Sequence, residues 1–159
     1  RPAALVAGQL AGTLALGLFQ AATYIAVGLA AGGHIEAGIP GALVLIALAT
    51  LITLAFGSIG LIAGMRASSP ENVQGLFPVV FVFLFISSMA MPRNLIETDW
   101  FRTIATYNPV SYMIEGIRSL LIFGWDTEAL ALGFGCAAAI LAVALTIASL
   151  SIKDRMVRT

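Results

Sequence analysis

Four long stretches of this chain contain no charged residue, and they constrain its fold more than any other feature. They cover Pro2–Gly33, Ala37–Met65, Asn72–Pro92 and Ala129–Ile152. Each reaches the ~20 residues that a helix needs to cross a ~30 Å hydrocarbon layer. Helices pair their own backbone groups in lipid, and the alternating pattern of barrel strands is absent from the sequence. We therefore predict an all-α fold, a polytopic transmembrane helical bundle with four spanning helices.

The composition supports a membrane protein and excludes some other classes. Charged residues make up 10% of the chain and hydrophobic residues 60%, whereas soluble domains carry roughly 25% charged residues. The formal net charge is zero, so we expect no nucleic-acid partner. A single cysteine, Cys136, excludes an internal disulfide. We see no tandem repeat or linker, and we treat residues 1–159 as a single transmembrane domain.

The beginning of the chain indicates a piece of a longer subunit. It starts with RPAALVAGQL and lacks an initiator methionine. Its first apolar stretch is much longer than the ~7–15-residue core of a signal peptide. We expect the first helices of the subunit to be missing.

The expected helices can be bounded from turn and capping residues. The first runs from about Ala4 to Ala31, the second from about Ala42 to Gly64, and the last begins near Thr127, a capping residue. Glycines four residues apart favour close packing of helices in lipid, or a specific dimer contact. These pairs are Gly8/Gly12, Gly28/Gly32 and Gly60/Gly64.

The basic residues predict the orientation. Four crossings place both termini on one side of the membrane. If that side is the cytoplasm, it receives five basic residues and the other side three, in agreement with the positive-inside rule. The five are Arg1, Arg66, Lys153, Arg155 and Arg158, and the three are Arg93, Arg102 and Arg118.

Half of the charge of the chain lies in one window, residues 91–128, which holds eight of the sixteen charged residues. Asn94 and Glu97 form an N-x-x-E variant of the capping box, which predicts a short helix through about Thr103. Asn108 and Pro109 then predict the start of a second helix, which Gly124 would end.

The second helix of this window is amphipathic. Val110, Met113, Ile114, Ile117, Leu120 and Leu121 recur at helical spacing, and the other face carries Ser111, Glu115, Arg118 and Ser119. At about 14 residues it is too short to span, so we expect an interfacial or re-entrant helical hairpin before the last span. Glu115 and Arg118, three residues apart, are expected to pair. An ordinary solvated loop with interfacial aromatic residues is the alternative.

At these residues the sequence resembles a known family, the ABC-2 type permease subunits of bacterial ABC exporters. The resemblance lies in Arg66, Ser69 and Glu71 before a helix that bears Phe and Pro, and in Met91–Pro92. It continues with Asn108-Pro109 followed by three further positions, Tyr112, Glu115 and Arg118. The run FISSMAMP departs from many relatives, which have Ser-Gly and a bulkier stretch there. That difference leaves the substrate path open.

The resemblance implies a transport function by alternating access. It implies a second permease copy or a related half, and a cytoplasmic ABC ATPase subunit that holds ATP and Mg while this chain holds no cofactor. Arg66, Ser69 and Glu71 would form the loop that contacts the ATPase. The motif from Asn108 to Arg118 would form the re-entrant hairpin in the lipid bilayer at the outer end. The place would be the bacterial inner membrane, with both termini of the chain cytoplasmic, and the cargo drug-like, lipid-linked or polysaccharide.

Two other classes of function fit the residues less well. An intramembrane enzyme needs a catalytic pair or a metal set at depth, but the only histidine, His34, lies in a turn, so we assign no catalytic and no metal-binding residue. A GxxxxGK[ST] phosphate loop is also absent. An ion-coupled carrier usually places ionisable residues in the membrane, and the four stretches contain none.

Overall fold

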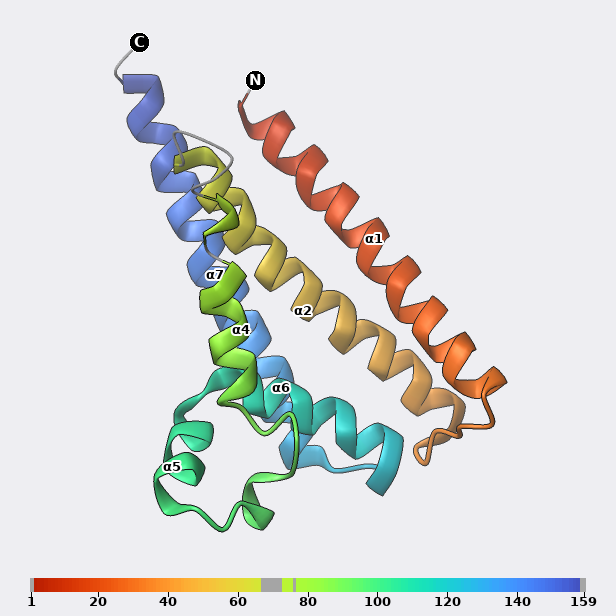
Figure 1. The fold of residues 1–159 in the computed structure, drawn as a ribbon. Helices are drawn as coiled ribbons and strands as arrows, with labels where there is room; N and C mark the ends of the chain where they lie inside the picture. The colour runs from red at the N-terminus through yellow and green to blue at the C-terminus, as the bar shows by residue number, and fades with distance from the viewer. Residues whose placement is uncertain (1, 67–72, 76, 158–159) are drawn as a thin grey trace.

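The computed structural model describes residues 2–66, 73–75 and 77–157, and all regular structure in these residues is helical. Helices α1 (Pro2–Ala30) and α2 (Gly38–Arg66) form an antiparallel pair, and α7 (Thr127–Val157) packs along the other side of α2 (Figure 1). The N-terminal end of α1 and the C-terminal end of α7 lie at the same end of the bundle (Figure 1). The polar window lies at the opposite end.

Three helices of the described residues are long and apolar enough to cross a membrane. They are Ala7–Ala30, Gly38–Arg66 and Thr127–Ser151. The bounds of the first two agree with the sequence to within four residues. The last helix begins at Thr127, but Thr127 is its first helical residue rather than its cap. Asp126 caps this helix instead, since its Oδ1 accepts a hydrogen bond from the Ala129 N–H at 3.0 Å.

The third apolar stretch differs from the prediction of a spanning helix. Its helix α4 runs only from Phe77 to Phe85, and a turn begins at Ile86. The Ser87 N–H bonds to the Leu84 carbonyl, which tightens the last turn, and the Ser88 N–H leaves the helix for a side chain of another element. The predicted count of four spans is therefore not confirmed by the described residues.

The polar window contains two helices, as expected, with both boundaries of the first one shifted toward the C-terminus. After the short η1 (Arg93–Leu95) come α5 (Asp99–Tyr107) and α6 (Pro109–Arg118), and α6 continues as a π-helical turn, η2 (Ser119–Phe123). The predicted capping box at Asn94 is wrong, because α5 begins only after Thr98. Arg102 donates from Nε to the Ile96 carbonyl at 2.7 Å and so holds the preceding residues in an extended path.

Gly124 ends α6 and its π-helical extension as predicted. Its φ is 92°, a conformation that glycine adopts without steric cost, and its N–H bonds to the Ser119 carbonyl at 2.8 Å.

The core lies where α2, α7 and the α6–η2 helix meet. Leu48 and Leu120 are fully buried there, and Ala37, Leu45 and Leu130 pack around them. Two backbone hydrogen bonds join the α1–α2 turn to η2 beside this core: the Ala37 N–H bonds to the Leu120 carbonyl at 3.1 Å, and the Glu36 N–H to the Leu121 carbonyl at 3.5 Å.

The glycine pairs predicted to bring helices together do not do so among the residues that the structure describes. A methyl group added at Gly8, Gly12, Gly28, Gly32, Gly60 or Gly64 would meet nothing within 4 Å. Close approach occurs at other glycines. Gly57 faces Thr13 of α1, and Gly116 of α6 faces Gly133 of α7. The predicted packing at these pairs is therefore not seen between the described helices, and a dimer contact there stays a prediction.

Candidate functional site

Helix α6 starts at a cap that the sequence identifies. Asn108 is almost fully buried, and its Oδ1 accepts a hydrogen bond from the Val110 N–H at 3.0 Å. Pro109 occupies the first helical position, where its missing N–H costs nothing. The Asn108 amide nitrogen also donates to the Phe83 carbonyl of α4 at 2.6 Å. One side chain thus starts α6 and binds the end of α4.

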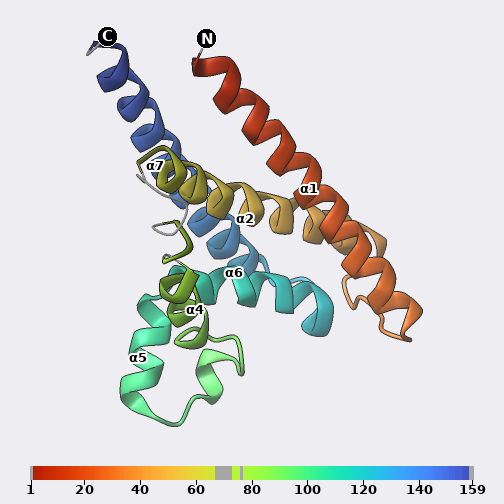
Figure 2. The same cartoon turned by 45° about the horizontal axis from the view of Figure 1, so that its top comes forward.

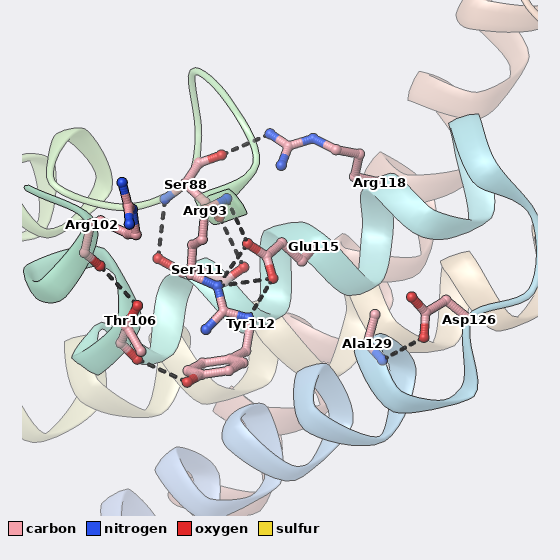
Figure 3. Close-up of polar contacts among 10 residues, drawn as sticks. All are labelled: Ser88, Arg93, Arg102, Thr106, Ser111, Tyr112, Glu115, Arg118, Asp126 and Ala129. Carbon is pink, nitrogen blue, oxygen red and sulfur yellow. Dashed lines mark hydrogen bonds and ion pairs between the residues drawn. The ribbon is translucent and has the colours of Figure 1, made fainter. Parts of the chain in front are cut away.

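Three more side chains of α6 reach the same neighbouring segment. Ser111, Glu115 and Arg118 follow Asn108 at intervals of three or four residues, so the four share one face of the helix. We call Asn108, Ser111, Glu115 and Arg118 the polar stripe of α6. Ser111 Oγ accepts from the Ser88 N–H at 3.0 Å, and its carbonyl accepts from the Ser88 hydroxyl at 3.2 Å. Figure 3 shows Ser111, Glu115 and Arg118 of the stripe directed toward Ser88 and Arg93.

Arg93 and Glu115 make the strongest contact of this stripe. Arg93 Nη2 lies 2.7 Å from one Glu115 oxygen, and its Nε lies 2.8 Å from the other. The guanidinium also lies over the Tyr112 ring, 4.1 Å from its centre. Both charged side chains are largely buried. A bidentate arginine–carboxylate contact fixes orientation as well as distance, so this pair locks η1 onto α6.

The expected pair of Glu115 with Arg118 is therefore wrong. Arg118 instead donates from Nη2 to the carbonyls of Ser88 and Met89, at 2.7 and 3.1 Å. The physical reason is that Arg93 reaches Glu115 from η1 and bonds to both of its carboxylate oxygens. Sequence reasoning missed Arg93 and Ser88 as partners. A signal was present in the lone arginine directly after the helix-breaking Pro92.

Tyr112 joins the two helices of the hairpin. Its hydroxyl donates to the Thr106 carbonyl of α5 at 2.8 Å. The opposite face of α6 is apolar, with Val110 and Met113 buried. The stripe, Tyr112 and this buried face together hold the end of α4, η1, α5 and α6 as one polar unit at the end of the bundle away from the termini (Figures 1 and 2).

A family model described as ABC-2 type transporter matches residues 1–122 of the 159-residue chain. The chain belongs to the ABC-2 type transporter family. The match spans all the motif residues on which the resemblance rested, and it identifies a transporter permease component that is a multi-pass membrane protein. Neither the curated proteins nor the solved structures with which the chain was compared match it.

The second set of motif residues of this ABC-2 permease is only partly placed. Arg66 ends α2, and its Nη2 donates to the Ser151 hydroxyl of α7 at 3.0 Å. This bond joins α2 and α7 at the end of the bundle where both termini lie. Ser69 and Glu71 lie outside the described residues. The role of these three residues stays a prediction.

Proposed function

We propose that this ABC-2 permease is one half of an ATP-driven exporter that works by alternating access. A second permease copy, or a related half, completes the substrate path. Separate cytoplasmic ATPase subunits, which hold ATP and Mg, supply the energy. The cargo is a drug-like, lipid-linked or polysaccharide molecule. The protein lies in the bacterial inner membrane with both termini of this chain in the cytoplasm.

The observation that carries this proposal is the polar stripe of α6. Lipid cannot satisfy backbone groups, so non-helical backbone at membrane depth is tolerated only where protein pairs it. The stripe bonds to the Phe83, Ser88 and Met89 carbonyls, just where the third apolar stretch stops being helical. A chain that breaks and is paired in this way fits a third crossing followed by a re-entrant α5–α6 hairpin, which makes four crossings in all.

Helix α4 supports the second copy. None of its nine residues is buried, although the helix consists of phenylalanine, valine, leucine and proline. In the single chain these side chains have no helical partner among the described elements with which to bury them. On the proposed assembly, lipid and the second permease half cover α4.

The inner end supports contact with an ATPase. ABC-2 permeases generally work with a cytoplasmic ATPase. Arg66 is the basic last residue of α2 and binds α7 through Ser151. Arg66 thus connects the ends of two spanning helices, so a force on Arg66 reaches both.

Copurification and ATPase stimulation test this proposal. We expect the full-length permease to copurify with a separately encoded ATPase, and Arg66→Ala and Glu71→Ala each to lower the ATP hydrolysis that the permease stimulates. Ser151→Ala is the matched control, because it removes the Arg66–Ser151 bond and leaves the charge. Glu36→Ala, an exposed acid at the far end, is expected to have no effect. Normal stimulation of ATP hydrolysis in both Arg66→Ala and Glu71→Ala would contradict the proposed contact with the ATPase. The absence of any copurifying ATPase would contradict the proposed exporter function.

A further inference from the structure

A cavity of about 620 Å³ lies beside the polar stripe, between η1, α5, α6 and the start of α7. Its wall includes Arg93, Arg102, Arg118, Glu115, Asp126 and Thr106. Leu95 and Phe123 also line it, and both are mostly exposed. The cavity thus combines charged groups with an apolar rim at the end of the bundle opposite the termini.

The charges of this wall do not balance. Three arginines face two carboxylates. Glu115 is paired with Arg93, and Asp126 Oδ1 accepts a hydrogen bond from the Ala129 N–H in the first turn of α7. Arg102 has an acidic neighbour, Asp99, but at 3.5 Å and on a side chain that is 94% exposed, where water screens the attraction.

Arg118 is the cation without a counter-ion. Its contacts among the described residues are the two carbonyls of Ser88 and Met89, both made by Nη2. Its other terminal nitrogen, Nη1, is buried and has no hydrogen-bond partner there. A buried donor on a permanently charged group is costly to leave unpaired. Arg118 therefore brings a positive charge to the cavity wall that no carboxylate of the described residues pairs.

We propose that this cavity binds an anionic phosphate group attached to an apolar chain. A guanidinium is planar and weakly hydrated, and its fork of donors matches phosphate oxygens. Arg118 and Arg102 supply the positive charge, and Leu95 and Phe123 offer apolar surface to the chain. The phosphate belongs either to a membrane phospholipid or to a phosphate-bearing molecule. Binding at this site does not depend on ATPase coupling, so it can be tested independently of the proposed exporter function.

Native mass spectrometry of the detergent-purified full-length protein tests the site. Phosphatidylglycerol, with one net negative charge, is compared with phosphatidylcholine, which carries a phosphate but no net charge. We expect phosphatidylglycerol to bind more tightly, and Arg118→Gln to weaken its binding about tenfold, as for the loss of a charge-assisted contact. Equal binding of the two lipids, or an unchanged affinity in Arg118→Gln, overturns the proposal.

Asp126→Asn keeps the inference falsifiable if Arg118→Gln does not fold. Asparagine caps a helix as well as aspartate does, so the variant keeps α7 and removes one negative charge from the wall. We expect it to bind phosphatidylglycerol a few-fold more tightly, the opposite of what unfolding does. Glu36→Gln removes the same charge from the α1–α2 turn, which does not line the cavity, and is expected to change nothing. Weaker binding in Asp126→Asn, or an equal gain in Glu36→Gln, contradicts the site.

Competition distinguishes the two sources of the phosphate. If inorganic phosphate displaces phosphatidylglycerol, the headgroup alone is recognised and a phosphate-bearing cargo can occupy the cavity. If it does not, the apolar chain is needed and the ligand is a membrane phospholipid. Either result is compatible with a phosphate site in the cavity. Whether the site exists is tested by the affinities of the Arg118→Gln and Asp126→Asn variants.

Discussion

Arg93 and Glu115 form the least exposed ion pair in the described part of the chain. Their side chains are 23% and 18% exposed. Hydrogen bonding to Glu115 raises the pKa of the Arg93 guanidinium above its ordinary value, and burial partly opposes that rise. Arg93 therefore stays protonated. Removal of either partner leaves a largely buried charge uncompensated, which costs more than the pair itself contributes.

We expect Glu115→Gln to lower the free energy of unfolding by about 2 kcal/mol, less than for a fully buried pair because some water reaches the site. Unfolding by SDS in mixed micelles measures it. The double variant Arg93→Gln/Glu115→Gln is expected to lose less than the sum of the single losses. In the matched double-mutant cycle, the losses of unfolding free energy in Arg118→Gln and Glu115→Gln are expected to add to within about 0.5 kcal/mol. Coupling of Glu115 to Arg118 instead of Arg93 contradicts the observed pairing.

The contact of α6 with α7 depends on two facing glycines. A Cβ at Gly133 would lie 3.1 Å from the Tyr112 carbonyl oxygen, and one at Gly116 would lie 3.2 Å from the Ala129 carbonyl oxygen. Both obstacles are backbone atoms, which cannot rotate away. Because lipid is as apolar as a leucine side chain, close backbone approach is a main source of helix association in membranes. The polar stripe is therefore positioned by a contact that excludes side chains.

We expect Gly133→Leu to separate α6 from α7 and to lower the free energy of unfolding by about 1–3 kcal/mol, the usual cost of overpacking. This loss is measured by heating the protein in detergent and following the fraction that stays monodisperse. Gly135→Leu is the matched control, since an added Cβ there meets nothing within 4 Å. An equal loss in both variants would show that glycine content matters rather than the contact.

The arrangement of the whole molecule makes the topology directly measurable. The polar window and the end of the bundle with both termini lie at opposite ends of the long helices (Figure 1). Tyr107 of the window is 84% exposed, and Gln74, in the connection between α2 and α4, is also exposed. The chain has one native cysteine, Cys136, so a cysteine-free background needs a single change.

In a Cys136→Ala background, we expect Tyr107→Cys to react with a membrane-impermeant maleimide added to intact cells. Gln74→Cys is expected to react only after the membrane is opened. The reason is that α2 and α7, which run from one end of the bundle to the other, are long enough to place its two ends on opposite sides of a bilayer. Reaction of Tyr107→Cys only from the cytosol would contradict the outer placement of the hairpin, and with it the exporter topology.

The features that follow from local chemistry were predictable from the sequence. The three long helices were predictable because lipid imposes their length and composition on the chain. The start of α6 at Asn108 and its end at Gly124 were predictable because a cap and a positive φ involve only neighbouring residues. The family was recognisable from the same short motifs.

The partners of the polar residues were decided by tertiary structure. Helical spacing shows which side chains share a face, but not which distant segment meets that face. Arg93 reaches Glu115 from 22 residues away, and so displaces the pairing with Arg118 that spacing alone favoured. The third apolar stretch is helical by composition, yet it stops at Phe85, where side chains of α6 pair its backbone. Glycine spacing likewise shows that a helix can be approached closely, but it does not show where. The location of the contact depends on the second helix, whose position the spacing does not give.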